Sequence, residues 1–198
     1  MNSLLIWVAL LPINIIQVLG PGAVSKQVAQ EIVQTASDKM ESQLGPRYRL
    51  DVKSWRTIKD PYPRLSGPDR RGDRQSLLEN WTIKRRLHSK GRFSLFILPP
   101  LRVNGLGYVA GIATICDGYS RVINVNANEK NVYGDDRKLH SAIAIAHELG
   151  HSLGARHDDT ESQIMHPAAL AYAYEPGLGF AAKARKQIRA CRASQRRN

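Results

Sequence analysis

The stretch from His147 to Met165, HELGHSLGARHDDTESQIM, constrains this chain more than any other. His147 and His151 are four residues apart, so a helix places both imidazoles on one face, about one turn apart. Two imidazoles in this arrangement can bind a single Zn²⁺ ion. Glu148 is offset by one position and can polarise a metal-bound water without being a ligand itself.

The residues after the expected helix supply a third ligand. Gly154 follows His151 by three residues and can adopt a left-handed conformation that ends the helix and turns the chain. This turn would bring His157 back to the metal. Three protein ligands leave the fourth position to water, which is typical of a catalytic zinc site. The alternative, chance histidines on a solvated helix, is disfavoured by the combination of Gly154, His157 and Met165.

The pattern H-E-x-x-H-x-x-G-x-x-H-D with a following methionine resembles the metzincin zinc endopeptidases. The resemblance implies that the three histidines are zinc ligands, that Glu148 is the general base and that Met165 forms a Met-turn beneath the metal. Asp158 after the third histidine is typical of the adamalysin (reprolysin) branch, whereas the short interval from His157 to Met165 is similar to matrixins. The implied fold is α/β, of the metzincin zincin type. It has a twisted mixed sheet of about four to five strands, long helices and a carboxy-terminal subdomain after the Met-turn.

The resemblance extends to residues 105–126, GLGYVAGIATICDGYSRVINVN. Alternation and turn residues predict strands at Tyr108–Ile115 and Val122–Val125. The first is similar to the edge strand above the zinc in adamalysins, and an exposed edge can pair with an extended peptide. An ordinary strand beside a glycine-rich turn is the alternative. The resemblance implies substrate contact by Leu106, Gly107, Tyr108, Val109 and Ala110.

The segment after Met165 is expected to contact substrate as well. Residues 167–177, PAALAYAYEPG, would line the pocket for the residue that follows the cut bond. No tyrosine stands two residues after the methionine, so no astacin-like tyrosine switch is implied. The first residues of the segment suggest an apolar pocket: Pro167, Ala168, Ala169 and Leu170.

The chain contains two cysteines, which are too few for a disulfide scaffold. They fit one bridge or two buried free thiols. A bridge joins matching positions in adamalysins, so the resemblance implies a disulfide between Cys116 and Cys191. Such a bridge would indicate an oxidising compartment.

Residues 1–20 have two interpretations. The apolar run Leu4–Leu11 suits a signal peptide. Adamalysin-like domains, however, begin with a β-strand, for which Leu4–Leu11 or Ile13–Leu19 is the candidate. We favour the signal peptide, which leaves residues 21–198 as the metalloprotease catalytic domain of a secreted, extracellular protein. A transmembrane anchor is disfavoured because proline and polar residues interrupt the run.

Periodicity predicts the scaffold elements. Apolar residues recur every four positions from Ala23 to Leu44, which indicates a helix. Alternation at Tyr48, Leu50 and Val52 indicates a strand with one buried face. A buried strand is expected at 93–98, and a second helix is expected at 76–89.

The net charge of +12 is unusual for 198 residues of otherwise ordinary composition. Residues 181–198 contain seven Lys or Arg and no acidic residue. Lys183, Lys186, Arg189 and Arg192 fall at helical spacing, so this basic helix could bind sulfated glycans or an anionic surface. A solvated basic face is the simpler interpretation. No aromatic residue interleaves the charges, which argues against single-stranded nucleic acid.

The main hypothesis is a zinc-dependent endopeptidase that hydrolyses peptide bonds in extracellular proteins. The alternative is a secreted adhesion or polyanion-binding protein with a vestigial zinc site. It rests on the basic tail and on Arg71-Gly72-Asp73, an integrin-type tripeptide in a polar loop. The complete set of ligands and base favours the enzyme. The sequence does not indicate an oligomeric state.

Overall fold

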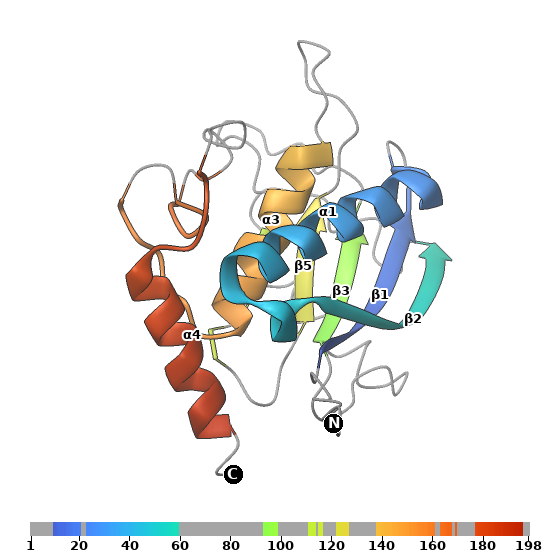
Figure 1. The fold of residues 1–198 in the computed structure, drawn as a ribbon. Coiled ribbons are helices and arrows are strands. Elements are labelled where there is room, and N and C mark those ends of the chain that lie inside the picture. Colours follow the sequence, from blue (N-terminus) through green and yellow to red (C-terminus); the bar gives the residue numbers. More distant parts are fainter. Residues whose placement is uncertain are drawn as a thin grey trace, which may run out of the picture.

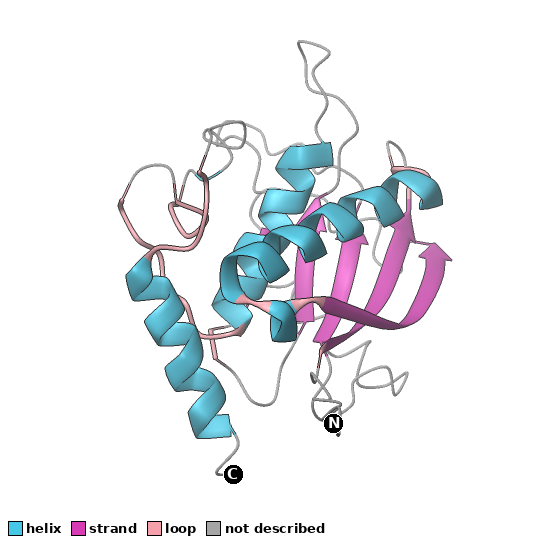
Figure 2. Cartoon of the chain, in the orientation of Figure 1, coloured by secondary structure: helices cyan, strands magenta, loops and turns pink. Residues whose placement is uncertain are grey.

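The computed structural model describes residues 10–20, 23–59, 93–98, 111–113, 115–116, 122–126, 138–160, 163–167, 169 and 177–195. These residues form one sheet with helices packed against it (Figures 1 and 2). The strands are β1 Leu11–Leu19, β2 Leu50–Lys59, β3 Phe93–Leu98, β4 Gly111–Ala113 and β5 Val122–Asn126. The helices are α1 Lys26–Leu44, the short 3-10 helix η1 Pro46–Tyr48, α3 Lys138–Ser152 and α4 Ala182–Gln195.

The sheet is five-stranded and mixed, in the order β2-β1-β3-β5-β4. Strands β2, β1, β3 and β5 run parallel, whereas β4 pairs antiparallel with β5 at one edge. Helices α1 and α3 contact each other, and α3 also contacts β4 and β5. Figure 1 shows α4 on the side of α3 away from β1 and β2. No described helix is long and apolar enough to cross a membrane.

Strand β1 fits the second interpretation of the amino terminus, in which the domain begins with a β-strand. Leu11–Leu19 lies between β2 and β3 and pairs with both. Ile13 and Ile15 enter the main core, while Ile16 and Val18 pack on the other face of the sheet. Cleavage after Gly20 would leave β2 and β3 without the strand between them, so the signal peptide over residues 1–20 stays a prediction that competes with this strand.

The first long helix begins slightly later than periodicity predicts. Ser25 caps it, because its Oγ accepts the backbone N–H of Val28 at 3.2 Å. Gly45, at φ +99°, ends it in a conformation that glycine adopts without strain. The residues between these caps pack one face of α1 into the main core, which supports the helix as predicted: Ala29, Ile32, Val33, Ala36 and Met40.

Strand β2 is longer and more exposed than its alternation predicts. Leu50 is buried as expected, but Val52 is 43% exposed. The register shifts here, since Val52 pairs with Ile13 while Ser54 pairs with Asn14. The extra residue, Lys53, resets the alternation in the manner of a β-bulge, and the strand's place at the sheet edge leaves it open to solvent.

Several sequence predictions fall outside the described residues. They concern the Arg-Gly-Asp loop at 71–73, the helix at 76–89, the substrate strand at 106–110, and Ala168 and Leu170.

Candidate metal centre

Three histidine side chains converge at the end of α3. Helix α3 places His147 and His151 one turn apart, and their Nε2 atoms are 3.1 Å apart. The Nε2 atom of His157 lies 3.1 Å from that of His151 and 3.3 Å from that of His147. The motif's spacing therefore brings the three predicted ligands together as a cluster able to hold a metal ion.

Backbone carbonyls determine which ring nitrogens carry hydrogen. The Nδ1 atom of His147 lies 2.5 Å from the carbonyl oxygen of Ile164, and that of His151 lies 2.8 Å from the carbonyl oxygen of Ala155. A carbonyl oxygen only accepts, so both Nδ1 atoms must donate. In the neutral rings each Nε2 then carries a lone pair rather than a hydrogen.

Burial keeps these two rings neutral. Desolvation lowers the pKa of His147 to about 4, although the hydrogen bond to Ile164 opposes this shift. Desolvation also lowers the pKa of His151 below its ordinary value. Near neutral pH, two imidazole lone pairs therefore face each other across 3.1 Å.

The cluster fits a tetrahedrally coordinated cation. Metal–nitrogen bonds of about 2.0–2.1 Å at tetrahedral angles separate neighbouring donor nitrogens by about 3.3 Å. The observed separations of 3.1–3.3 Å are close to this value. Converging lone pairs repel one another unless a cation lies among them, so the donor set matches a three-histidine metal site.

Gly154 turns the chain from α3 toward His157, as predicted. Its φ is +106°, and its N–H donates to the His151 carbonyl at 2.8 Å. A Cβ at this position would lie 2.5 Å from the Cβ of Cys191. Glycine is therefore required here for its backbone conformation and for its close approach to α4.

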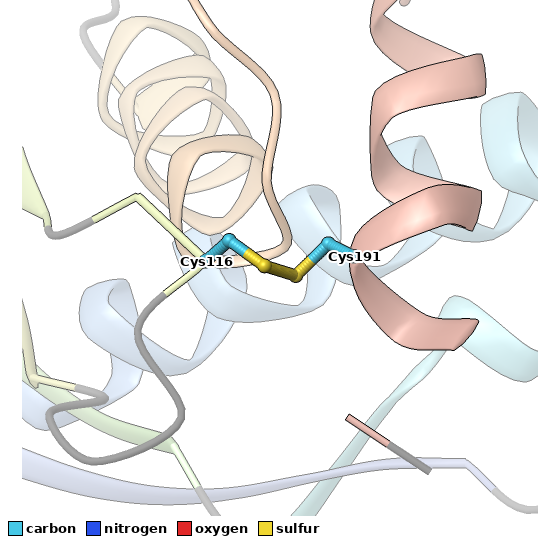
Figure 3. The surroundings of a disulfide bond; sticks show 2 residues. All are labelled: Cys116 and Cys191. Carbon is cyan, nitrogen blue, oxygen red and sulfur yellow. A yellow bond between two sulfur atoms is a disulfide. The ribbon is translucent and has the colours of Figure 1, made fainter. Parts of the chain in front are cut away.

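The predicted disulfide between Cys116 and Cys191 is present (Figure 3). It joins the segment after β4 to α4, across 75 residues of sequence, with the Cα atoms 5.9 Å apart. The N–H of Cys116 donates to the His151 carbonyl at 3.1 Å. The bridge thus connects α4 to the end of the helix that carries two of the histidines.

A tight turn at Gln163–His166 lies beneath α3. It is closed by the His166 N–H, which donates to the Gln163 carbonyl at 3.0 Å. Met165 is fully buried. A Cβ on Gly150 would lie 2.5 Å from the Met165 sulfur, so the glycine within the HELGH motif lets the methionine pack directly against the helix.

Two acidic residues flank the cluster. Glu148 is 6% exposed, and burial raises its pKa to about 8. A cation held by the adjacent histidines would oppose this shift, because opposite charge favours the carboxylate.

The Thr160 hydroxyl and N–H donate to the Asp158 carboxylate at 2.7 and 3.2 Å, which lowers the pKa of Asp158. The N–H of Asp158 donates to the Met165 carbonyl at 3.0 Å, so Asp158 ties the His157 segment to the turn.

The expected substrate residues are placed only in part. Pro167 is exposed directly after the turn, whereas Ala169 is 4% exposed. Ala168 and Leu170 lie outside the described residues, so the apolar pocket expected at these four positions stays a prediction. Of the edge strand, Gly111–Ala113 is described, and it forms the outer strand β4.

Some supporting residues were missed at the level of sequence. The sequence does not indicate that the carbonyls of Ile164 and Ala155 bind the histidine rings, since every residue carries a carbonyl. The side chain of Gln187 in α4 accepts the N–H of Arg156, next to His157, at 3.0 Å. Gly150 did leave a signal, because glycine inside a helix is unfavourable and usually has a packing reason.

The chain belongs to metallo-peptidase family M12, whose family model matches residues 20–194. The prediction of a metzincin-type metalloprotease is thereby confirmed. No curated protein matches the chain at a significant level.

Solved structures share the fold. Archaemetzincin from Methanopyrus kandleri is similar with a TM-score of 0.65 and 17% identity, over 96% of this chain and 99% of that chain. Metalloproteinase-II from Bacteroides fragilis is similar with a TM-score of 0.60 and 16% identity, over 93% of this chain and 54% of that chain. Family membership implies that the chain acts on peptide or protein substrates.

Proposed function

We propose that the chain is a zinc-dependent endopeptidase. His147, His151 and His157 would hold one zinc ion, and Glu148 would be the general base. The observation that carries this proposal is the convergence of three Nε2 atoms within 3.3 Å, two of them with lone pairs directed by backbone carbonyls. Three histidine ligands that leave the fourth coordination position to water most often bind zinc.

Zinc bound to the three imidazoles would supply a Lewis acid that activates a water and polarises the scissile carbonyl. Glu148 would take a proton from the attacking water onto its carboxylate. It would then deliver that proton to the nitrogen of the leaving amine. Glu148 directly follows the ligand His147 and is buried, and the positive charge of a bound zinc ion would favour its carboxylate form, which is the form that accepts a proton.

The substrate would lie extended along the outer strand of the sheet. Strand β4 pairs with β5 on one side, and no other described strand pairs with its second side, where an extended peptide could add. Leu106, Gly107, Tyr108, Val109 and Ala110 precede this strand and would continue the docking edge. Pro167 and its neighbours would contact the residue after the cut bond.

We further propose that the protein works in an oxidising, extracellular compartment. The Cys116–Cys191 disulfide supports this setting, since such bridges persist where thiols are not kept reduced. Asp158 and the cysteine pair support an adamalysin-like branch, and the turn at Met165 would serve as its Met-turn. N-terminal sequencing of the mature protein would test whether β1 is retained; a start after Gly20 would contradict its role in the sheet.

Replacement of Glu148 by Gln tests the enzymatic proposal. We expect zinc content to be unchanged and kcat/KM on a cleavable peptide to fall about 10²–10⁴-fold, the usual contribution of general acid–base catalysis. Peptide-library cleavage and zinc content by atomic absorption would be measured on both proteins. Near-normal turnover by the variant would refute the role of Glu148, and absence of zinc from the parent would refute the metal site.

A further inference from the structure

Helix α4 has an outward face that carries only positive charge. Its inner side is buried at Ala184 and Ile188. No acidic residue occurs in Ala182–Gln195. Residues three or four positions apart on a helix are neighbours, so the exposed cations form one patch. This α4 basic face consists of Lys183, Arg185, Lys186 and Arg189.

The ion pairs found among the described residues do not neutralise this face. They join Arg49 to Glu41, Lys53 to Asp51, and Lys138 to Glu31, all away from α4. Lys183 interacts electrostatically with Asp158, whereas none of the described ion pairs involves Lys186 or Arg189.

The α4 basic face adjoins the metal centre. Gln187 accepts the N–H of Arg156, which directly precedes His157. Lys183 lies one turn before Gln187 and hence on the same side of the helix. Its positive charge also contributes to the lowered pKa of Asp158, the residue after His157. The patch thus begins beside the segment that carries the third histidine and extends along α4.

We propose that the α4 basic face is an exosite that binds an acidic segment of the protein substrate. This inference rests on the proposed peptidase function. A substrate bound in extended form advances about 3.3 Å per residue, so chain beyond the cut bond leaves the metal centre within a few residues. An acidic segment in that part of the substrate would contact the cationic side chains of the α4 basic face rather than solvent. Such complementarity would mainly raise the encounter rate and lower KM.

Direct binding of a labelled peptide tests the face without any cleavage. The probes are fluorescein-labelled peptides of about ten residues, one rich in Glu and one with Gln in place of each Glu. The test variant carries Lys183→Gln, Lys186→Gln and Arg189→Gln, because glutamine is a good helix former. The control carries Arg47→Gln, Arg56→Gln and Lys59→Gln, three exposed cations of η1 and β2. Both variants lose the same net charge.

We expect the parent to bind the Glu peptide more tightly than the Gln peptide by fluorescence anisotropy. The Kd for the Glu peptide should rise about tenfold in the α4 variant, as expected for the loss of three modest exposed charge pairs. It should change less than about twofold in the control variant, where the lost charges lie away from the patch. The difference between the peptides should vanish in 1 M NaCl, where the Debye length is about 3 Å.

Cleavage then connects the face to the active site. Each substrate consists of the same cleavable sequence, a flexible linker of about eight residues and a tag of either six Glu or six Gln. Each tag is placed at the amino-terminal end in one version of the substrate and at the carboxy-terminal end in another. The parent should show a lower KM for one Glu-tagged substrate at unchanged kcat. The α4 variant should lose that advantage and still cleave the Gln-tagged substrate normally.

The outcomes separate this inference from the proposed function. Equal binding of both labelled peptides by the parent, or equal loss in the control variant, would overturn the exosite. Loss of heparin binding in the α4 variant, without Glu-peptide binding by the parent, would overturn it in favour of a sulfated-glycan site. Selective Glu-peptide binding with no cleavage of any peptide would leave the acidic-segment site standing and refute the peptidase function.

Discussion

The three histidines are held in two different ways. His147 and His151 belong to helix α3, most of whose residues are buried, and both rings donate a hydrogen bond to a backbone carbonyl. His157 is exposed and lies on an extended segment after the turn at Gly154. The helix alone sets the distance between the first two, whereas the third depends on contacts from distant parts of the chain.

Those contacts come from α4 and from the turn at Met165. Gln187 binds the backbone of Arg156, Cys191 packs against Gly154, and the Met165 carbonyl accepts the N–H of Asp158. The difference teaches that the helix alone spaces the first two ligands, whereas the position of the third ligand depends on contacts from outside the twelve-residue motif. Variants in helix α3 and in the His157 segment should therefore differ in folding stability even where they lower zinc affinity equally.

Replacing a ligand should have the largest effect. His151→Ala and His157→Ala should each raise the Kd for zinc by more than the 10–100-fold typical of outer-shell changes. His151 is 7% exposed, so its loss should also leave a void and lower the melting temperature of the metal-free protein. His157→Ala should leave that temperature nearly unchanged. Zinc titration and metal-free thermal melts measure both effects, and equal melts for the two variants would contradict the comparison.

Removing the disulfide should come next. The double change Cys116→Ser and Cys191→Ser opens a loop of 75 residues and should cost about 4 kcal/mol of unfolding free energy in the chain-entropy model. Urea unfolding of the oxidised parent and of the variant measures this loss. Zinc affinity should fall as well, because the bridge supports the turn toward His157. Unchanged zinc affinity would show that the bridge acts on stability alone.

A methyl group at Gly154 should have an intermediate effect. Gly154→Ala combines a strained positive φ, on the order of 1–3 kcal/mol, with a clash against Cys191. Gly177→Ala is the matched control, since Gly177 also has a positive φ but has no atom within 4 Å of an added Cβ. Both should lose stability in urea unfolding, but only Gly154→Ala should weaken zinc binding. Similar zinc affinity in both variants would argue against the close contact.

The smallest effect is expected at Gln187. Gln187→Ala removes the acceptor for the Arg156 N–H, an exposed hydrogen bond that contributes about 0.5–1.5 kcal/mol. The Kd for zinc should rise roughly two- to tenfold. Gln187→Glu keeps an acceptor oxygen and should restore most of the affinity. Equal losses in the two variants would show that the hydrogen bond does not position His157.

Local patterns predicted the parts of this protein that local geometry controls. The four-residue spacing of His147 and His151, the left-handed turn at Gly154 and the extent of α1 were recognisable because each follows from the backbone conformation of consecutive residues. The partner of Cys116 came from resemblance, since two cysteines alone allow a bridge or free thiols. Burial of Val52 was mispredicted because an edge position in the sheet is a property of strand pairing.

The amino terminus shows the same limit most clearly. Leu11–Leu19 is apolar enough for a signal peptide and for a buried strand, and composition does not distinguish the two. Only the pairing of β1 with both β2 and β3 makes the strand integral to the sheet.

The sequence by itself determined the chemistry of the site: three imidazoles, a carboxylate beside them and the glycine that turns the chain. The tertiary structure alone decided which carbonyls orient the rings, how Met165 fits under Gly150 and what holds His157 in place. The physical reason is distance along the chain. Ligand type and helical spacing are local properties, whereas ring orientation and loop position depend on residues that only folding brings together.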